Sequence, residues 1–472
     1  MGEAVYFSLF NTFVTIYYNQ AIGLSNALIG TAVMLAMIGD AISDPIVGMV
    51  SDRWRSRHGR RHPFLFFAPL PLAITIYCIF NPPLALIDDP SGADQLLLFA
   101  WLSVWIILSR GFLTLYSVPH LALGAELTSD QHQRSLLFSA NTIVTYIAGA
   151  SFAFIAWSFF FAGERTRASD GELVPAHLDA AAYSPLVFTA CALVLVGIWF
   201  CASSTYKYVP SLSQADRSQH RLTLVRFLRE LLGTLKNRNY FYLLSGFFFF
   251  MIASGIIETM SVFTSTFFWE LKPDEIRWLG LISAPAALIG AVLAPTLMRR
   301  FDRKPVMLAS LCGIAIFAQL PVDLRLLGLF PDNASSSLLP LLLANMASLV
   351  FCMGVGSVAI LSMIGDVIDE SELDNGLRQE GLFYSARAFF AKAANSFGHF
   401  FAGVMLDLFV RLPFEAVPGQ LDEGVITRLG ITAGPVMGLS AIVSLAFYSR
   451  YKLSRDRHRE ILEKLSERRQ RT

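Results

Sequence analysis

Long apolar stretches alternate with short polar ones from one end of the chain to the other. Twelve of these stretches are long enough to cross about 30 Å of hydrocarbon as α-helices, the form in which each backbone group is hydrogen-bonded within its own segment. They cover residues 3–22, 27–50, 63–86, 96–122, 135–162, 183–202, 240–266, 278–298, 305–322, 337–363, 382–409 and 428–449. The pattern predicts an all-α membrane protein with twelve transmembrane helices.

A longer polar stretch divides the predicted helices into two sets of six. Within it, Leu224, Val225 and Leu228 recur at helical spacing among basic residues, which predicts an amphipathic helix on the inner leaflet. The expected parts are an N-terminal six-helix bundle at 1–202, a cytoplasmic linker at 203–239, a C-terminal six-helix bundle at 240–449 and a cytoplasmic tail at 450–472.

The basic residues indicate the orientation of the chain in the membrane. Of the 37 Lys and Arg residues, 27 lie in the loops on the side of the two termini and 7 in the loops on the opposite side. Positive residues accumulate on the cytoplasmic side, so both termini are expected in the cytoplasm. We expect a multi-pass protein of a cell membrane, a bacterial inner membrane, with membrane lipid as its surroundings.

Composition and motifs exclude several classes of function. The chain is 54% hydrophobic and only 15% charged, with a mean hydropathy of +0.53, whereas a soluble domain has about a quarter of its residues charged. The basic residues follow the membrane boundaries, so no nucleic-acid partner is expected. The sequence has no phosphate-binding loop and no catalytic or metal-ligand spacing, and its five cysteines lie in apolar stretches. We expect neither an enzyme nor an ATP-driven pump, and no cofactor.

A basic turn that contains an aspartate recurs at the same place in each half. It includes Asp52-Arg53 after the second predicted helix and Asp302-Arg303 after the eighth. Two related six-helix bundles, with the solute held between them near the bilayer midplane, are the build of major facilitator transporters. The repeat therefore predicts two pseudo-symmetric six-helix bundles in the major facilitator fold.

Several longer motifs resemble those of the glycoside–pentoside–hexuronide:cation symporters, the melibiose permease-like family of the major facilitator superfamily. The resemblance covers essentially the whole chain. The motifs are Gly39-Asp40-Ala-Ile-Ser43-Asp44-Pro45, Val118-Pro119-His120 through Glu126-Leu-Thr128, and Gly365-Asp366-Val-Ile-Asp369 leading to Lys392. Membership implies symport of a sugar or glycoside, with H⁺ or Na⁺ as the coupling ion.

Two carboxylates on the second predicted helix are candidates for the ion chemistry. Asp40 and Asp44 are four residues apart, so they project from one face, and Asp40 lies near mid-membrane. With Ser43 alongside, their oxygen atoms suit Na⁺ or Li⁺, or one carboxylate serves as a proton site; the structural alternative is a salt bridge between helices. The resemblance implies a cation site of Asp40, Asp44 and Thr114, and Ser43 stands where the melibiose permease has an asparagine.

Arg110 shares one face of the fourth predicted helix with Thr114 and Ser117. Its guanidinium could grip a carboxylate or phosphate on the substrate as a planar fork, or it could neutralise Asp40 or Glu258 inside the protein. These alternatives stay open from the residues alone.

The resemblance adds further candidates for substrate binding. Ser117 and Thr142 stand where the melibiose permease has sugar-contacting charged residues, and Lys392, with Tyr384 nearby, matches a lysine of that permease's ion and sugar network. The predicted substrate-binding residues are Arg110, Ser117, Thr142, Tyr384 and Lys392.

Charged residues at the cytoplasmic ends of the helices are predicted to act as gates. Ion pairs there would hold the outward-open state and part when the inner side opens, although ordinary interfacial charge placement is an equally good interpretation of any single residue. The predicted gating residues are Asp52, Arg53, Arg60, Arg61, Asp302, Arg303, Asp366 and Asp369.

These expectations combine into one principal hypothesis. The chain is a monomeric secondary active transporter that couples a small-molecule substrate, a sugar or glycoside, to H⁺ or Na⁺ by alternating access. The alternative is a transporter of an amphiphile such as a lysophospholipid, since vertebrate lysolipid carriers also resemble this family. A sensor or scaffold on a transporter fold is disfavoured, because a receptor does not need paired carboxylates inside the membrane.

Overall fold

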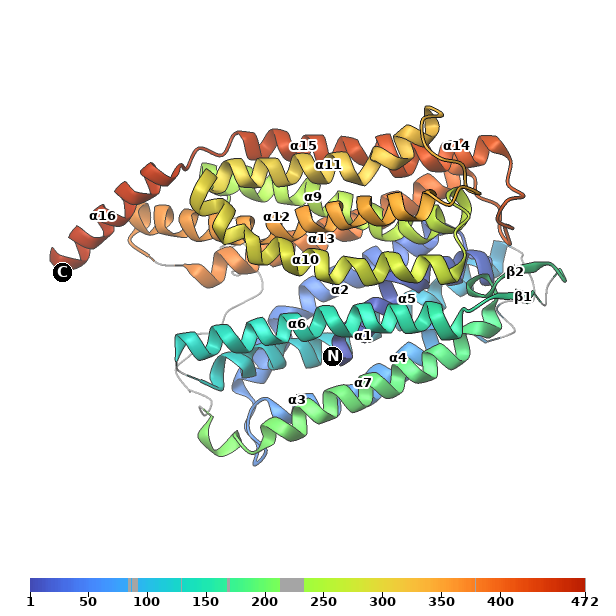
Figure 1. The fold of residues 1–472 in the computed structure, drawn as a ribbon. Coiled ribbons are helices and arrows are strands. Elements are labelled where there is room, and N and C mark those ends of the chain that lie inside the picture. Colours follow the sequence, from blue (N-terminus) through green and yellow to red (C-terminus); the bar gives the residue numbers. More distant parts are fainter. Residues whose placement is uncertain are drawn as a thin grey trace. The chain divides into compact units, whose positions relative to one another are not determined.

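The computed structural model describes residues 1–83, 86, 92–128, 130–167, 170–212, 233–377 and 379–471. These residues form long helices joined by short turns (Figure 1). Strands among the described residues are limited to one antiparallel hairpin, in which Glu164–Thr166 (β1) pairs with Leu173–Pro175 (β2). The all-α class predicted from the apolar pattern is confirmed.

The first half of the chain contains seven α-helices among its described residues, three of them extended or preceded by short irregular turns. The elements are α1 (Gly2–Ile16) with the π-helical turn η1 (Tyr17–Ala21), α2 (Asn26–Arg53), α3 (His62–Phe67), α4 (Pro69–Ile79), α5 (Gly92–Glu126), α6 (Gln131–Ile155) with η3 (Ala156–Phe160), the turns η4 (Ala176–Leu178) and η5 (Ala180–Ala182), α7 (Tyr183–Tyr206) and η6 (Val209–Ser211).

The second half repeats this pattern and ends in a polar helix. Its described elements are α9 (Arg238–Phe263) with η7 (Thr264–Phe268), α10 (Pro273–Phe301), α11 (Arg303–Leu326), α12 (Leu338–Asn375), α13 (Glu380–Met405) with η8 (Leu406–Val410), α14 (Glu423–Ile431), η9 (Thr432–Val436), α15 (Met437–Ser449) and α16 (Arg455–Arg471).

The twelve predicted membrane spans all coincide with helices. Eleven helical segments of the described residues are long and apolar enough to cross a membrane, judged by length and composition, and the twelfth is the continuous run of α1 and η1. The third is divided at Ala68 into α3 and α4, because Pro69 has no backbone N–H to continue the hydrogen-bond ladder. The tenth continues to Asn375, beyond its predicted end at residue 363, because its last turns are helical but charged.

Close Cα packing divides the chain into two compact units. Unit 1 comprises residues 1–220, 258–281 and 399–429, and unit 2 comprises 221–257, 282–398 and 430–472. The predicted division at residues 202, 239 and 449 stays a prediction. The predicted amphipathic helix of the linker falls in 213–232, outside the described residues.

Unit 1 contains more than the N-terminal helices. The hairpin-side ends of α9, α10 and α13 belong to it, together with α14. Asp407, in the turn after α13, accepts hydrogen bonds at the start of α2 from Ser25 Oγ (2.5 Å), from the backbone N–H of Asn26 (3.1 Å) and from that of Ala27 (2.7 Å). A helix begins with unpaired N–H groups, so this carboxylate caps α2 from a distant part of the sequence.

A second contact reinforces the same end of unit 1, which we call the hairpin end. Gln20 donates to the carbonyl of Pro413 (3.1 Å) and accepts from the backbone N–H of Ala416 (2.9 Å). Arg167 of the hairpin donates to the carbonyl of Glu415 (2.7 Å). The chain segment after α13 is therefore bound to the N-terminal helices by backbone and side-chain hydrogen bonds.

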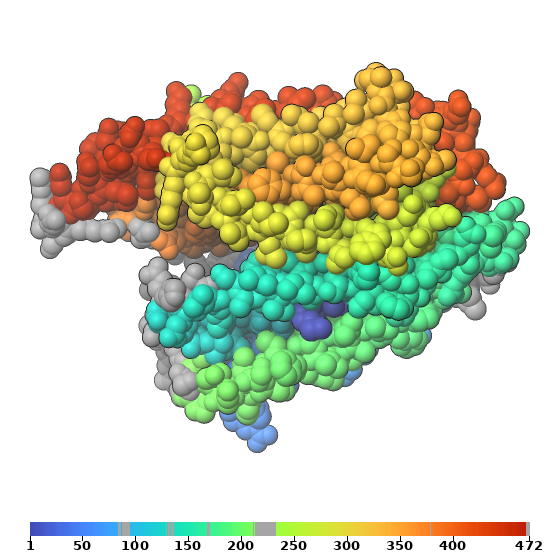
Figure 2. Space-filling view, viewed as in Figure 1, coloured from blue at the N-terminus to red at the C-terminus, as the bar shows by residue number. Residues whose placement is uncertain are grey.

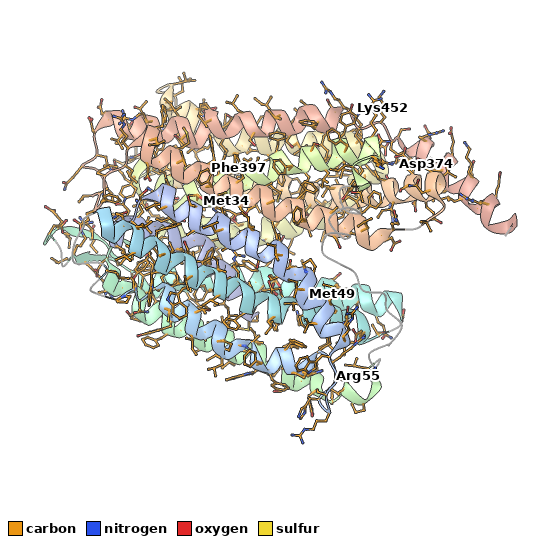
Figure 3. The ribbon with its side chains drawn as sticks, turned by 180° about the vertical axis from the view of Figure 1, so that it is seen from behind. Met34, Met49, Arg55, Asp374, Phe397 and Lys452 are labelled. Carbon is orange, nitrogen blue, oxygen red and sulfur yellow. The ribbon has the colours of Figure 1, made fainter. Side chains whose placement is uncertain are left out.

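The outer faces of the helices carry large apolar side chains. Helices α6, α7 and α10 lie at the surface in the space-filling view (Figure 2), and Phe188, Val196 and Phe200 of α7 are between 61 and 73% exposed. On α2, Met34 and Met49 precede the polar turn that carries Arg55 (Figure 3). Faces of this composition are those expected in contact with lipid chains.

In unit 2, glycines allow helices α10 and α12 to approach closely. A side chain at Gly290 would collide with the carbonyl oxygen of Phe351, and one at Gly354 would collide with that of Ala287. Small residues at helix contacts are the usual means of packing in a membrane, because lipid offers no hydrophobic driving force between helices. The main buried cluster of this unit centres on Met363, Ile364 and Val367 of α12.

Replacing Asp407 tests the cap on α2. We expect Asp407→Ala to lower the free energy of unfolding by about 1–2 kcal/mol, because several donors at the start of α2 lose their acceptor. The measurement is the melting temperature of the purified protein in detergent. Leu408→Ala, at a neighbouring side chain that is 71% exposed, is the control. Equal melting temperatures for the two variants would show that the cap contributes nothing.

Candidate functional site

The two aspartates of α2 meet a threonine of α5 inside unit 1. Thr114 Oγ1 lies 3.1 Å from Asp40 Oδ1 and 3.1 Å from Asp44 Oδ1. A hydroxyl carries a single proton, so Thr114 can donate to only one carboxylate at a time. Asp40 and Thr114 are buried, at 4% and 2% exposure. Thr114 thus brings together two acidic groups that share one helix face.

Ser43 adds a fourth oxygen-bearing side chain. Its hydroxyl lies 3.5 Å from Thr114 Oγ1 and 3.3 Å from the carbonyl of Asp40, to which it donates. Two carboxylates and two hydroxyls form a set of hard oxygen ligands, the type that alkali and alkaline-earth cations prefer. The four predicted cation-site residues are therefore neighbours in the structure, while ion binding itself stays a prediction.

Arg110 is the basic partner of this cluster. Its Nη1 lies 3.8 Å from Asp40 Oδ2, and both side chains are less than 8% exposed. The guanidinium also faces three aromatic rings of α1, with ring centroids 4.8 Å (Phe10), 5.3 Å (Phe7) and 5.8 Å (Tyr6) away. A cation in such an aromatic setting is held by the ring quadrupoles as well as by the carboxylate.

Of the two internal partners that the sequence left open for Arg110, the structure places Asp40 beside it. The buried Arg110 Nε makes no hydrogen bond to any described residue. A planar guanidinium with an unused donor can still accept an anionic or hydroxyl group from a ligand. Its predicted role in substrate binding therefore stays open.

The other predicted substrate residues lie on helices α5, α6 and α13. Ser117 lies one turn beyond Thr114 on α5 and is half-buried. Thr142 is exposed on α6, and its hydroxyl donates to the carbonyl of Phe138 in the preceding turn (3.0 Å). Tyr384 and Lys392 lie on α13 within unit 2, so their participation in a shared site stays a prediction.

Three of the predicted gating residues of unit 1 join an ion-pair cluster at the end of α2. Arg61 Nη2 lies 2.5 Å from Asp52 Oδ1 and 2.9 Å from Glu126 Oε1, and Arg60 Nη2 lies 2.8 Å from the same glutamate oxygen. Arg61 also donates to Ser51 Oγ (2.8 Å), and its side chain is only 5% exposed. The cluster joins α2, α3 and α5 within one unit.

The equivalent cluster of unit 2 includes the C-terminal helix. Arg303 pairs with Asp366, and His458 of α16 lies 3.5 Å from Asp366 Oδ1 and 3.0 Å from Asp369 Oδ2. Arg455 lies 4.0 Å from Asp302 Oδ1. Each of these pairs is again internal to its unit, and a gating role for them stays a prediction.

Sequence reasoning did not assign a role to Glu126 or His458. Glu126 lies within a motif quoted above, and its place at the end of a span could have marked it as a partner for the basic turn. His458 lies in a tail that contains many arginines, where no local pattern distinguishes it. The remaining predicted gating residue, Arg53, is exposed at the end of α2.

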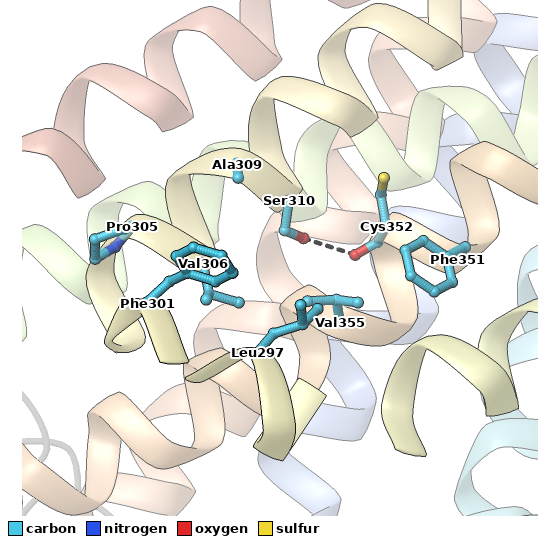
Figure 4. A pocket seen from close by; sticks show the side chains of 9 residues that line it. All are labelled: Leu297, Phe301, Pro305, Val306, Ala309, Ser310, Phe351, Cys352 and Val355. Carbon is cyan, nitrogen blue, oxygen red and sulfur yellow. Dashed lines mark hydrogen bonds between the residues drawn. The ribbon is translucent and has the colours of Figure 1, made fainter. Parts of the chain in front are cut away.

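Each unit also contains a cavity among its described residues. In unit 1, a cavity of about 380 Å³ between α1, α5, α6 and α7 is partly polar, with Glu3, His120, Asn141 and Thr145 among its lining residues. In unit 2, a cavity of about 430 Å³ is apolar apart from Ser310 and Cys352 (Figure 4). Ser310 Oγ donates to the Cys352 carbonyl there (2.6 Å), so this cavity offers no charged group to a polar solute.

Comparisons with known proteins agree with this architecture. A family model described as MFS/sugar transport protein matches residues 1–455. The chain is 25% identical to the symporter YnaJ of Bacillus subtilis (strain 168), over 93% of this chain and 87% of that protein. It is also 25% identical to the isoprimeverose transporter of Lactiplantibacillus pentosus, over 94% and 85%.

A solved structure gives the same result for the fold. The inward open conformation of the xylose transporter XylE from E. coli superposes with a TM-score of 0.60 at 14% identity, over 96% of this chain and 94% of that chain. At this identity the likeness bears on the fold alone. The predicted major facilitator fold is confirmed.

The cluster around Arg61 should be important for stability. We expect Arg61→Ala to lower the free energy of unfolding by about 2–3 kcal/mol, because it leaves Asp52 and Glu126 without their shared, largely buried partner. Thermal unfolding in detergent measures the effect. Arg57→Ala removes an exposed arginine of the same turn and should change stability by less than about 0.5 kcal/mol. A loss no larger than that of the control would contradict a structural role for this cluster.

Proposed function

Because the chain belongs to the MFS/sugar transport protein family, we propose that it is a secondary active transporter that carries a sugar or glycoside together with H⁺ or Na⁺. The observation that carries this proposal is the cluster of Asp40, Asp44, Ser43 and Thr114 inside the membrane-spanning pair α2 and α5. Ionisable side chains at such a depth are costly and are typical of ion or proton pathways.

The charge of the cluster favours cation binding. Two ionised carboxylates and one guanidinium give Asp40, Asp44 and Arg110 a formal charge of −1, which one bound H⁺ or Na⁺ neutralises. A neutral site is easier to enclose in a low-dielectric interior than a charged one. Loading the cation therefore favours a state in which the site is closed off from water, and this is the coupling that symport needs.

Separate observations support the proposed class of substrate and the proposed orientation of the chain in the membrane. The isoprimeverose transporter among the relatives supports a sugar or glycoside over an amphiphile for this chain. Arg110, with its unused buried Nε, is the residue of the first unit best suited to recognise an acidic or hydroxyl group on that solute. The excess of basic residues in the loops on the terminal side supports cytoplasmic termini in a cell membrane.

Ligand-induced thermal stabilisation tests the proposal. The purified protein is heated with a panel of glycosides, hexuronides and lysophospholipids, with and without Na⁺ and across pH. We expect a saccharide to raise the melting temperature, Na⁺ or acid to strengthen that effect, and Asp40→Asn to abolish the cation dependence. Stabilisation by lysophospholipids alone, independent of cation and of Asp40, would falsify the symport proposal in favour of amphiphile transport.

Thr114 provides a second test at the cation site. We expect Thr114→Val to weaken the cation dependence of stabilisation by about 10-fold or more, because the hydroxyl between the carboxylates is lost, and Thr114→Ser to restore it. The measurement is the cation concentration, or the pH, at half-maximal stabilisation. Thr189→Val on α7 is the control, since that exposed hydroxyl donates only to the carbonyl of Pro185 in its own helix (2.9 Å). A Val variant that titrates like the native protein would remove Thr114 from the site.

A further inference from the structure

A small basic cavity lies within unit 2, at the end of α10 and the start of α11. Its volume is about 290 Å³. The spans Pro273–Phe301 and Arg303–Leu326 end and begin there, so the cavity is at a boundary of the membrane. Three of its lining residues are arginines and none is acidic; the lining consists of Pro295, Met298, Arg299, Arg303, Ser362 and Arg455. This composition favours an anion.

Arg455 of α16 is fixed by contacts with the end of α10. Its Nη2 donates to the carbonyls of Met298 (2.6 Å) and Arg299 (3.0 Å). Its backbone N–H donates to Asp302 Oδ2 (3.2 Å), and its Nε lies 4.0 Å from Asp302 Oδ1. The last turn of a helix leaves carbonyl groups available, and this arginine binds two of them. Arg455 therefore lines the cavity in a defined position.

Arg303, at the start of α11, is only partly engaged. Its Nη1 pairs with Asp366 and lies 3.4 Å from His458 Nδ1. Its Nε and Nη2 make no hydrogen bond or ion pair with any described residue, and the side chain is 31% exposed. Nε and Nη2 form one edge of the planar guanidinium, and such an edge can bind two phosphate oxygens at once.

Arg299 and Ser362 supply further donors. The side chain of Arg299 is exposed, and its guanidinium forms no ion pair or hydrogen bond with a described residue. The hydroxyl of Ser362 on the half-buried face of α12 also lacks a hydrogen bond to the described part of the chain. Asp302 and Asp366 lie beside the other two arginines, and neither carboxylate lines the cavity. Three guanidinium groups and a hydroxyl thus surround one space with donors still available.

From this donor set we propose that the cavity binds the phosphate group of an anionic ligand. Arginine suits this role because its planar fork matches the oxygens of a phosphate. A phosphate in the cavity joins Arg299 of α10, Arg303 of α11 and Arg455 of α16. The inference goes beyond transport of a solute, since none of these residues belongs to the proposed cation site.

The bound group strengthens the attachment of α16 to unit 2. Ile461 and Leu465 of this helix are already buried in the main apolar cluster of the unit, at 2% and 4% exposure. The phosphate adds a polar bridge at the start of the same helix, through Arg455. A ligand that binds only the folded protein raises its melting temperature, so occupancy of the cavity can be measured as stabilisation.

The apolar cavity of unit 2 favours a lipid as the source of the phosphate. Leu297 and Phe301 line that cavity, and they lie in the same last turns of α10 as Met298 and Arg299 (Figure 4). An anionic phospholipid carries its phosphate next to acyl chains, so both of its parts find a chemically matched surface at this end of the helix. Basic pockets between membrane helices bind anionic headgroups in this way. A free phosphate ion would use the arginines alone.

Titration of the purified protein in a neutral detergent and phosphate-free buffer tests the site. The probes are a short-chain phosphatidylglycerol, a phosphatidylcholine of the same chain length and inorganic phosphate. We expect phosphatidylglycerol to raise the melting temperature saturably and more than phosphatidylcholine does. Arg299→Gln should raise the concentration at half-maximal stabilisation by about 10-fold, because charge-assisted hydrogen bonds are lost. Arg299→Lys should restore part of the affinity, since it keeps the charge but not the fork.

Arg300→Gln is the matched control. It removes the same charge from the next residue of α10, where Arg300 is also exposed but stacks on Phe301 (5.3 Å) and does not line the cavity. We expect it to shift the half-maximal concentration by no more than about 3-fold, the effect of one exposed charge. Melting temperatures within a few degrees of the native protein, measured without ligand, show that the variants are folded.

The outcomes distinguish the site from general attraction to basic residues. Equal shifts in Arg299→Gln and Arg300→Gln, or no stabilisation by any of the three probes, would overturn the site. Stabilisation that depends on Arg299 supports it, with a lipid as the ligand if phosphatidylglycerol acts alone and a free ion if inorganic phosphate acts equally well. A solute panel without any stabilising saccharide sinks the symport proposal but leaves this titration unchanged.

Discussion

An ionised carboxylate in a hydrocarbon environment is stable only beside positive charge or hydrogen-bond donors, and the interior of unit 1 is organised around this requirement. Asp40 and Asp44 share the hydroxyl of Thr114, and Arg110 lies beside Asp40. Glu258 has an imidazole and an amide as partners. Each acidic group has partners on a helix other than its own. Pairing its charge therefore also fixes which helices must be adjacent.

The same requirement explains how distant segments become attached to the N-terminal helices. Asp407 lies near the end of a membrane span, and it is satisfied by the unpaired N–H groups at the start of α2. Gln20 makes two further hydrogen bonds to the segment after α13. Unit 1 is thus held together at its hairpin end by polar groups that face each other, and the apolar surfaces of α7 and α10 are left for lipid.

Much of the fold could be predicted from sequence, because the length and hydropathy of each segment along the chain indicate where a membrane helix lies. Each of the twelve apolar stretches coincides with a helix, and eleven helical segments of the described residues are long and apolar enough to cross a membrane. The charged last turns of α12, which continue to Asn375 and end at the left-handed Gly376 with a φ of 72°, gave no such signal. A helix that is held by hydrogen bonds to its own backbone need not be apolar once it leaves the lipid.

For the candidate site, the sequence determined the pairings that lie within one helix. The spacing of Asp40, Ser43 and Asp44 fixed a common face on α2, and that of Arg110 and Thr114 fixed one on α5, because an α-helix returns to the same side after about four residues. Only the tertiary structure decided that these two faces meet, that Arg110 lies beside Asp40, and that Glu258 lies beside His399. Those contacts depend on helix packing between residues separated by up to 141 positions, about which local spacing carries no information.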